Sequence, residues 1–261
     1  IGRYSMKKIF SGLAITTALA TTCLAHAADV KPTVVLVHGA FADSSSWNGV
    51  VKILEKDGYP VIAAANPLRG VASDAQSVAS IVKSVKTPVV LVGHSYGGAV
   101  ISDAAYGSQN VKALVYVAAF TPEKGETAAE LSGRFPGGTL ASALAAPVDL
   151  ADGGKDLYIQ QDKFHDQFAA DVSEADARLM AAGQRPITVA ALNEAASEPA
   201  WKTIPSWFVY GDKDKNIPAQ AMAFMAERAH AKQTVVVKGG SHVVMVSHPK
   251  VVANLIEKAA Q

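Results

Sequence analysis

The stretch VVLVGHSYG at residues 89–97 joins an apolar run to a serine flanked by glycines. The run is typical of a buried strand, and the glycines permit a sharp turn where a larger side chain would strike the neighbouring backbone. We therefore predict a strand, a tight turn and a helix, with the Ser95 hydroxyl projecting above the sheet. This arrangement is a nucleophile elbow, in which the serine is exposed for attack on a substrate.

A serine nucleophile needs a base and a carboxylate that orients the base, and two later loops carry these residue types. Asp214 lies in the loop that follows the apolar run WFVY, and His242 lies in the loop that follows TVVV. Both loops therefore come directly after a predicted strand, as Ser95 does. We predict Ser95 as nucleophile, His242 as general base and Asp214 as the orienting acid.

The acid has two rivals in the sequence. Asp212 stands two residues before Asp214 in the same loop, and Glu123 follows another predicted strand. We interpret Asp212 as a loop residue that accepts hydrogen bonds and keep Glu123 as a third candidate.

An oxyanion hole needs only backbone N–H donors with suitable geometry. The tripeptide His38-Gly39-Ala40 follows the apolar run VVLV at residues 34–37. We predict that the N–H groups of Ala40 and Tyr96 form the hole. No metal or organic cofactor is expected, because the predicted chemistry uses side chains and backbone alone.

These motifs resemble those of the α/β-hydrolases. The resemblance covers residues 31–261 and is carried by LVHGAFADSSSW, LVGHSYGG, VYGDKDKNIP and GGSHVVMVSHP. The chain order serine, aspartate, histidine is that of this fold. The family pattern also places the acid three residues after a glycine, which favours Asp214 over Asp212.

The chain is most similar to the branch that holds plant methyl-ester esterases and hydroxynitrile lyases, and to bacterial carboxylesterases of the pyrethroid-hydrolase type. The resemblance implies an α/β fold, with a mostly parallel central sheet, helices on both faces and a helical cap insertion. It implies hydrolysis of small to medium apolar carboxylic esters through an acyl-enzyme. His38 and His94 match structural positions of the family.

Three other activities remain open. Hydroxynitrile lyases of this branch carry Thr and Lys where this chain has Gly39 and Val243, so cyanide chemistry is disfavoured. A cofactor-free perhydrolase would use the same three residues. A non-catalytic small-molecule receptor is the alternative of another class, although receptors on this fold often lose part of the catalytic set. The serine at position 95 argues against the relatives that use an aspartate nucleophile.

Composition sets the broad class of the protein. The chain has 261 residues, 49% of them hydrophobic, and a formal net charge of +1. No basic run suggests nucleic acid as a partner. The resemblance to the hydrolases implies a small-molecule ester as the substrate.

The first 27 residues have the pattern of an N-terminal extension and a cleavable signal peptide. Met6-Lys7-Lys8 is a positive region, an apolar stretch follows, and Ala25-His26-Ala27 fits a cleavage site. We expect cleavage after about Ala27, a periplasmic or secreted protein, and no stable membrane association afterwards. Cys23, the sole cysteine, would leave with the leader.

We expect residues 28–261 to form one domain in which strands alternate with helices. The alternation stops at about residues 122–202, where no strand pattern is convincing, and we assign this segment as the cap. Its larger apolar residues are candidate walls of a substrate pocket: Phe135, Leu140, Leu144, Leu157, Phe164, Phe168 and Leu179.

Overall fold

The computed structural model describes residues 1–2 and 30–261. The predicted signal peptide therefore lies almost wholly outside the described residues. Residues 31–261 form one compact unit. Within the described part of the chain, no helix is both long enough and apolar enough to cross a membrane.

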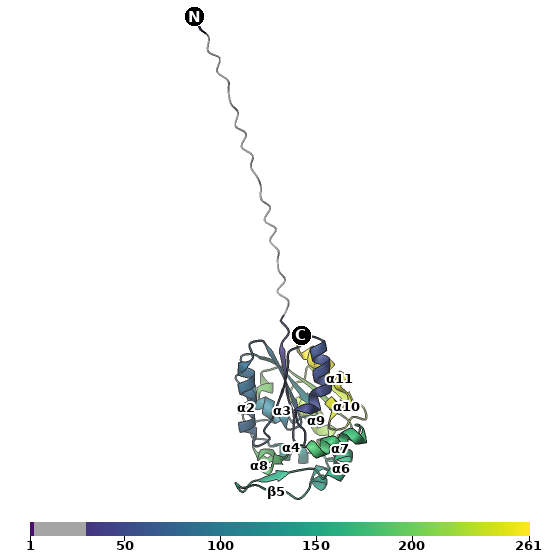
Figure 1. Cartoon of the computed structure of the whole chain (residues 1–261). Coiled ribbons are helices and arrows are strands. Elements are labelled where there is room, and N and C mark those ends of the chain that lie inside the picture. The colour runs from purple at the N-terminus through teal and green to yellow at the C-terminus, as the bar shows by residue number, and fades with distance from the viewer. Residues whose placement is uncertain (3–29) are drawn as a thin grey trace. The chain divides into compact units, whose positions relative to one another are not determined.

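A six-stranded parallel sheet forms the centre of this unit, with the strand order β2-β1-β3-β4-β8-β9 (Figure 1). Valine dominates the inner strands, and the side chains of β1 and β3 are buried on both faces, as expected when helices cover a parallel sheet on both sides. The strands are β1 (Thr33–Val37), β2 (Val61–Ala64), β3 (Val89–His94), β4 (Val111–Val117), β8 (Ser206–Gly211) and β9 (Gln233–Val237).

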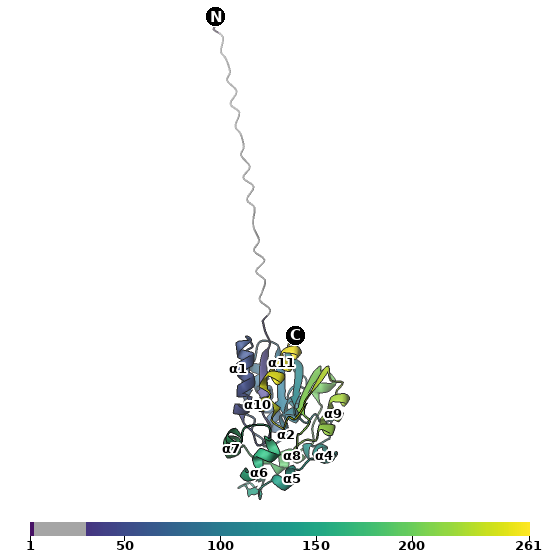
Figure 2. The ribbon, with the colours of Figure 1, turned by 90° about the vertical axis from the view of Figure 1, so that its right-hand side faces the viewer.

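Helices cover the two faces of the sheet. α1 packs against α11, and α2 packs against α3. Figure 1 shows α2 and α11 on opposite sides of the sheet, and Figure 2 shows the same layers from the side. The covering elements are η1 (Ser44–Trp47), α1 (Asn48–Lys56), α2 (Val71–Ser84), α3 (Gly97–Ala104), α9 (Ala219–Arg228), α10 (Val244–Ser247) and α11 (Pro249–Ala259).

The segment predicted as a cap, residues 122–202, lies between β4 and β8 and gathers at one end of the sheet (Figure 1). The expectation that it holds no strand is wrong, because three short strands pair there as an antiparallel sheet. Its elements are α4 (Ala128–Gly133), α5 (Leu140–Ala143), β5 (Val148–Asp149), β6 (Lys155–Leu157), α6 (Gln161–Phe168), α7 (Glu174–Gly183), β7 (Ile187–Thr188), α8 (Val189–Asn193) and η2 (Ala200–Lys202).

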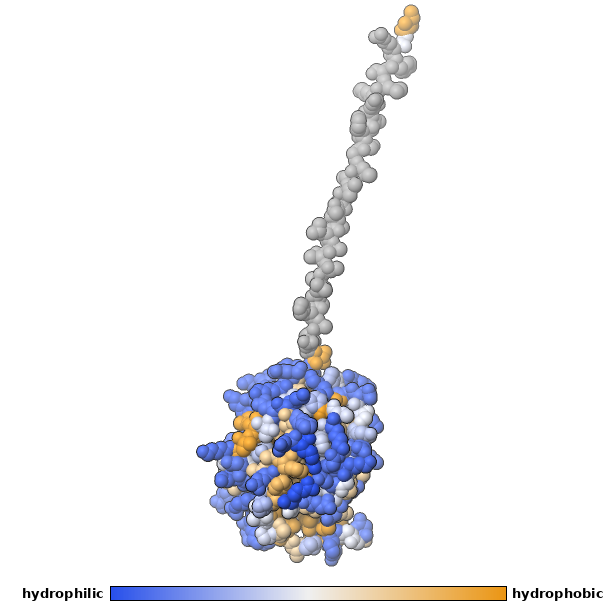
Figure 3. Space-filling view, turned by 180° about the vertical axis from the view of Figure 1, so that it is seen from behind, coloured by the Kyte–Doolittle hydropathy of each residue, from blue (hydrophilic) through white to orange (hydrophobic). Residues whose placement is uncertain are grey.

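One face of the unit is largely polar (Figure 3). Figure 3 shows one face on which hydrophilic residues predominate and apolar residues occupy separate spots. Apolar side chains instead fill a continuous core on both sides of the sheet. The sheet is thus a rigid support, and the loops at the carboxyl ends of its strands can hold functional side chains in fixed positions.

Candidate active site

Ser95 occupies the sharp turn between β3 and α3. Its backbone has a φ of 53°, a left-handed conformation that is uncommon for a residue other than glycine. The turn requires glycines on either side of Ser95, because the neighbouring backbones leave no room there for a Cβ atom. A Cβ atom on Gly97 would lie 2.6 Å from the carbonyl oxygen of Val37, and one on Gly93 would lie 2.6 Å from that of Gly97. This strain holds the serine at the end of the sheet, as in a nucleophile elbow.

Ser95, His242 and Asp214 form a continuous chain of hydrogen bonds. His242 Nε2 lies 2.9 Å from Ser95 Oγ, and His242 Nδ1 lies 2.6 Å from Asp214 Oδ2. An ionised carboxylate only accepts, so Nδ1 carries a hydrogen and Nε2 is left to accept the hydroxyl hydrogen of Ser95. All three residues are buried. The structure therefore brings together residues 95, 214 and 242, with the imidazole in the orientation of a general base.

The second oxygen of Asp214 is held by the backbone of its own loop. Oδ1 accepts hydrogen bonds from the N–H groups of Asn216 and Ile217, at 2.8 and 2.9 Å. Both carboxylate oxygens of Asp214 are thus occupied, and the side chain has one orientation.

The two rival acids lie elsewhere. Asp212 accepts a hydrogen bond from the backbone N–H of Gly239 and so joins two loops. Glu123 forms an ion pair with Lys202; burial opposes ionisation of Glu123, but the hydrogen bond from Lys202 lowers its pKa. Neither carboxylate is hydrogen-bonded to His242, which leaves Asp214 as its acidic partner.

The two predicted oxyanion-hole residues lie beside Ser95. The loop after β1 presses against the elbow so closely that a Cβ atom on Gly39 would lie 2.6 Å from Ser95 Cβ and 3.2 Å from the backbone nitrogen of Tyr96. Ala40 and Tyr96 both line the cavity that contains Ser95. Within residues 30–261, neither backbone N–H donates to a protein acceptor. Both donors are therefore available to a ligand.

Two further histidines hold the loops of the site. His94 Nε2 lies 3.0 Å from the carbonyl oxygen of His242 and donates to it, because a carbonyl only accepts. Burial lowers the pKa of His94 well below its ordinary value, so the ring is neutral. The ring centres of His94 and His242 are 4.8 Å apart. His94 thereby supports the loop that carries His242.

His38 fixes the first loop in a similar way. Its Nδ1 lies 2.9 Å from the carbonyl oxygen of Gly39, and its Nε2 accepts a hydrogen bond from the backbone N–H of Asn66. Burial also lowers the pKa of His38, which keeps this imidazole neutral as well.

An apolar cavity of about 220 Å³ opens over Ser95. Two predicted wall residues, Leu140 and Leu144, line it. Phe168 is instead fully buried with its ring 5.1 Å from that of His242, and Leu179 is 73% exposed. The larger apolar walls of the cavity are Phe41, Phe120, Leu140, Leu144, Leu192 and Ile217.

Two polar wall residues, Ser132 and Asn216, were not predicted from the sequence, and of these only Asn216 is buried. Asn216 stands two positions after Asp214, and that spacing was the only signal that could have placed it near the site.

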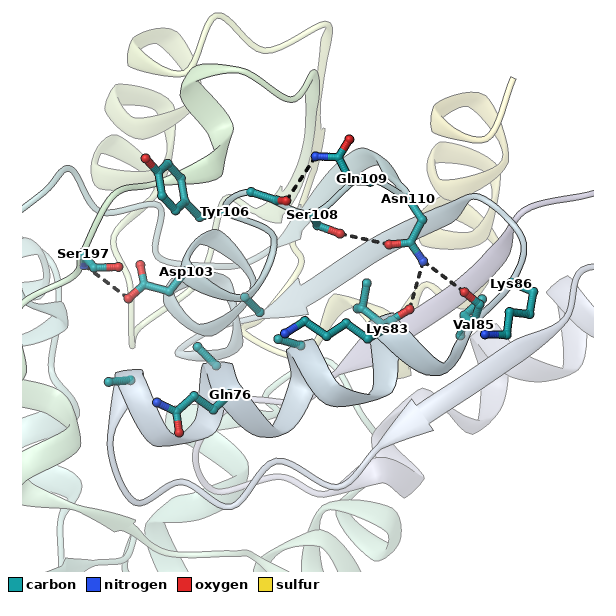
Figure 4. Close-up of a pocket in the computed structure, with 16 residues that line it drawn as sticks. Gln76, Lys83, Val85, Lys86, Asp103, Tyr106, Ser108, Gln109, Asn110 and Ser197 are labelled. Carbon is teal, nitrogen blue, oxygen red and sulfur yellow. Dashed lines mark hydrogen bonds between the residues drawn. The ribbon is translucent and has the colours of Figure 1, made fainter.

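A larger hollow of about 700 Å³ lies between α2 and the loop after α3 (Figure 4). Its rim includes Lys83, Asp103 and Tyr106, but it contains none of the three residues of the hydrogen-bonded chain. Among the described residues, no group of three or more His, Cys, Asp or Glu side chains could hold a metal ion.

Comparison with known proteins decides the family. The sequence profile described as "Alpha/beta hydrolase family" matches residues 34–255. The chain belongs to the α/β-hydrolase family.

Two relatives of this α/β-hydrolase match more than four fifths of its length. The alpha/beta hydrolase nvfD of Aspergillus novofumigatus is 25% identical over 251 residues, which cover 88% of this chain and 97% of the relative. The alpha-hydroxynitrile lyase of Arabidopsis thaliana is 24% identical over 238 residues, which cover 83% of this chain and 92% of the relative. The similarity therefore extends over most of the hydrolase unit, and one of the relatives is a lyase.

Solved structures share the fold. Polyneuridine aldehyde esterase has a TM-score of 0.77 at 18% identity, covering 88% of this chain and 100% of that one. A pyrethroid hydrolase from Sphingobium faniae has a TM-score of 0.69 at 21% identity, covering 88% and 97%. The predicted α/β-hydrolase fold is confirmed, as is the resemblance to a branch that includes esterases and hydroxynitrile lyases.

Proposed function

We propose that this α/β-hydrolase is a serine carboxylesterase acting on small to medium apolar esters. One observation carries the proposal: a chain of hydrogen bonds joins Ser95 Oγ through His242 to Asp214. At its Ser95 end, this chain lies beside two free backbone donors and an apolar cavity. Esterase names among the relatives and structural neighbours support the same reaction class.

The first half of the reaction acylates the serine. Ser95 Oγ attacks the ester carbonyl carbon while His242 Nε2 takes the hydroxyl proton, and Asp214 stabilises the imidazolium that forms. The negative charge on the carbonyl oxygen is stabilised by the N–H groups of Ala40 and Tyr96. The tetrahedral intermediate then collapses, the bond to the alcohol oxygen breaks, and the alcohol leaves with the proton from His242.

The second half releases the acid. His242, neutral again, takes a proton from a water molecule that attacks the acyl carbon. Collapse of the second tetrahedral intermediate breaks the bond to Ser95 Oγ, which recovers the proton from His242. The carboxylic acid leaves and the enzyme returns to its starting state.

Lyase chemistry is the nearest alternative, because a hydroxynitrile lyase is among the relatives. In that branch a lysine after the catalytic histidine stabilises cyanide, whereas Val243 occupies the position here and is fully buried. No cationic side chain lines the cavity among the residues that the structure describes. These features favour ester hydrolysis over release of cyanide.

The test is a panel of p-nitrophenyl esters from acetate to palmitate, with the Ser95→Ala variant alongside. We expect hydrolysis by the wild type and no turnover by the variant, with an unchanged melting temperature. Ser102→Ala is the matched control, because this buried serine on α3 bonds to Tyr116 and does not line the cavity. Full activity in Ser95→Ala would refute the proposal, and silence of the folded wild type would favour a lyase or a receptor.

Export of the enzyme is a further part of the proposal and rests on the sequence of residues 6–27. The test is the N-terminal sequence of protein recovered from the periplasm or the medium. We expect a mature chain that begins near Ala28, and a cell-associated chain that retains the leader would contradict export.

A further inference from the structure

Asn216 is a buried polar residue in the wall of the apolar cavity. It is only 4% exposed, and it lines the same cavity as Ser95, Ala40 and Tyr96. A buried amide group reduces the stability of the fold unless it is hydrogen-bonded. The oxygen and the nitrogen of this side chain therefore each need a hydrogen-bond partner.

The orientation of the Asn216 amide follows from a chain of contacts that starts in the backbone. The side-chain atom of Gln167 that lies 3.0 Å from the carbonyl oxygen of Lys215 must be a nitrogen, because a carbonyl only accepts. The same Gln167 nitrogen lies 2.7 Å from the side chain of Asn216, so the Asn216 atom there must be the oxygen. Thr139 Oγ1 donates to the remaining Gln167 oxygen at 2.8 Å and locks the glutamine in place.

This network leaves the Asn216 Nδ2 group without a protein acceptor among residues 30–261. The Asn216 amide cannot be flipped to exchange its nitrogen and oxygen. In the flipped orientation its NH₂ group would face the NH₂ group of Gln167, and two donors cannot form a hydrogen bond. The cavity around this amide is walled mostly by apolar residues, and the hydroxyl groups of Ser95, Tyr96 and Ser132 in its described lining form no hydrogen bond with Nδ2. The site therefore contains a fixed donor in a wall whose other polar side chains are the hydroxyl-bearing residues Ser95, Tyr96 and Ser132.

We propose that Asn216 is a specificity residue that donates a hydrogen bond from Nδ2 to a second, uncharged oxygen of the substrate. The preferred esters then carry a carbonyl, ether or hydroxyl oxygen in the group that the cavity holds, in addition to the scissile ester. An anionic group is disfavoured, since the described lining of the cavity contains no cation to balance it. This inference rests on the proposed esterase function and names its substrate class.

The expected discrimination is large enough to measure. When a bound substrate lacks the second oxygen, the Nδ2 group loses its contact with water and gains no acceptor in return. We expect the acceptor-bearing ester to be favoured about tenfold to a hundredfold over its apolar isostere.

The experiment uses pairs of esters of equal shape that differ by one CH₂ replaced by oxygen. p-Nitrophenyl 4-methoxybutanoate is paired with the hexanoate, and 3-methoxypropanoate with the pentanoate. A second set places the same ether oxygen in the alcohol half of an acetate ester. The quantity measured is the ratio of kcat/KM within each pair, for the wild type, Asn216→Leu and the control Ser132→Ala.

The ratio isolates specificity from catalysis. The backbone N–H of Asn216 holds Asp214, so a substitution at 216 could slow every ester, but that effect divides out within a pair. We expect at least one pair to favour the ether in the wild type and in Ser132→Ala, and this preference to vanish in Asn216→Leu. Equal rates within every wild-type pair, or a preference that Ser132→Ala alone abolishes, would overturn the inference.

A binding measurement separates this inference from the proposed function. Dissociation constants for the same pairs are measured by calorimetry with Ser95→Ala and with Ser95→Ala/Asn216→Leu. Tighter binding of the ethers that requires Asn216 would support the inference even if no ester is hydrolysed. Equal binding of both members of every pair would refute it even if the wild type is an active esterase.

Discussion

Replacing Asp214 by asparagine changes one oxygen of the carboxylate into an NH₂ group, and the structure determines which one. Among the described residues, Oδ1 accepts from the backbone N–H groups of Asn216 and Ile217, whereas Oδ2 accepts only from His242 Nδ1. The oxygen of the new amide will therefore stay at the Oδ1 position, where it keeps two hydrogen bonds. The NH₂ group will then point at His242 Nδ1.

That orientation reverses the tautomer of the base. Facing a donor, His242 Nδ1 must accept, so the hydrogen moves to Nε2 and the imidazole can no longer take the proton of Ser95. The opposite amide orientation would set a donor against two N–H groups and lose two hydrogen bonds, at about 1–3 kcal/mol for each unsatisfied group. We expect kcat to fall by about 10³- to 10⁴-fold, a barrier increase of about 4–5.5 kcal/mol.

The assay is the initial rate of p-nitrophenyl acetate hydrolysis at neutral pH, together with thermal melting. Asp212→Asn is the matched control, since Asp212 lies in the same loop and accepts only from the backbone of Gly239. We expect this control to stay within about threefold of wild-type kcat, because it leaves the contacts of His242 unchanged. The reasoning is refuted if Asp214→Asn retains more than a tenth of the activity, or if Asp212→Asn loses as much.

Two further changes test the cavity and the support of the elbow. Leu144→Ala should move the optimum of the ester panel to longer acyl chains. Each methylene newly buried should raise kcat/KM about fourfold, because its burial contributes about 0.8 kcal/mol. The control Leu157→Ala changes a residue outside the cavity, so it should lower the melting temperature without shifting the optimum. Burial raises the pKa of Asp74 although the Tyr96 hydroxyl donates to it. A raised folded-state pKa means that the stabilisation is complete below the unfolded pKa of about 3.9 and is lost as pH rises through the folded value. Chemical denaturation from pH 3.5 to 7 should therefore show the free energy of unfolding of the wild type falling relative to Asp74→Asn, and parallel curves would contradict this.

The sequence predicts the fold well where a run of apolar residues is also buried in the structure. The apolar run that ends at Val37 predicts a strand over residues 33–37, and β1 has these bounds, with every residue buried. The spacing of Ser73 and Gln76 fits a capping box and predicts a helix that begins at Ser73, and this prediction is wrong. α2 begins at Val71, and Ser73 Oγ instead donates to the carbonyl oxygen of Gly70 within the first turn. A serine and a glutamine three apart can form a capping box only where the chain actually enters the helix.

The cap segment was harder to predict for a physical reason. Strands β5 and β7 have two residues each and β6 has three, which is too short for any alternation of apolar and polar residues to be visible. Their pairing depends on contacts between positions far apart, such as Asp156 with Thr188. The candidate catalytic residues were easier to place, because each follows a parallel strand and the carboxyl ends of neighbouring strands share one edge of the sheet.

The loop after β8 shows why substrate choice could not be deduced from the same motifs. Asp214 and Asn216 are two residues apart, and the backbone N–H of one holds the carboxylate of the other. The direction of the Asn216 amide, however, is set by Gln167 of α6, which Thr139 holds in turn, and both of these lie in the cap segment. The proposed catalytic residues thus all follow strands of the sheet. The proposed specificity donor, in contrast, is oriented by contacts between the loop after β8 and the cap segment. A change in the cap at Gln167 should therefore alter which ester is preferred while the contacts of Ser95 and His242 stay the same.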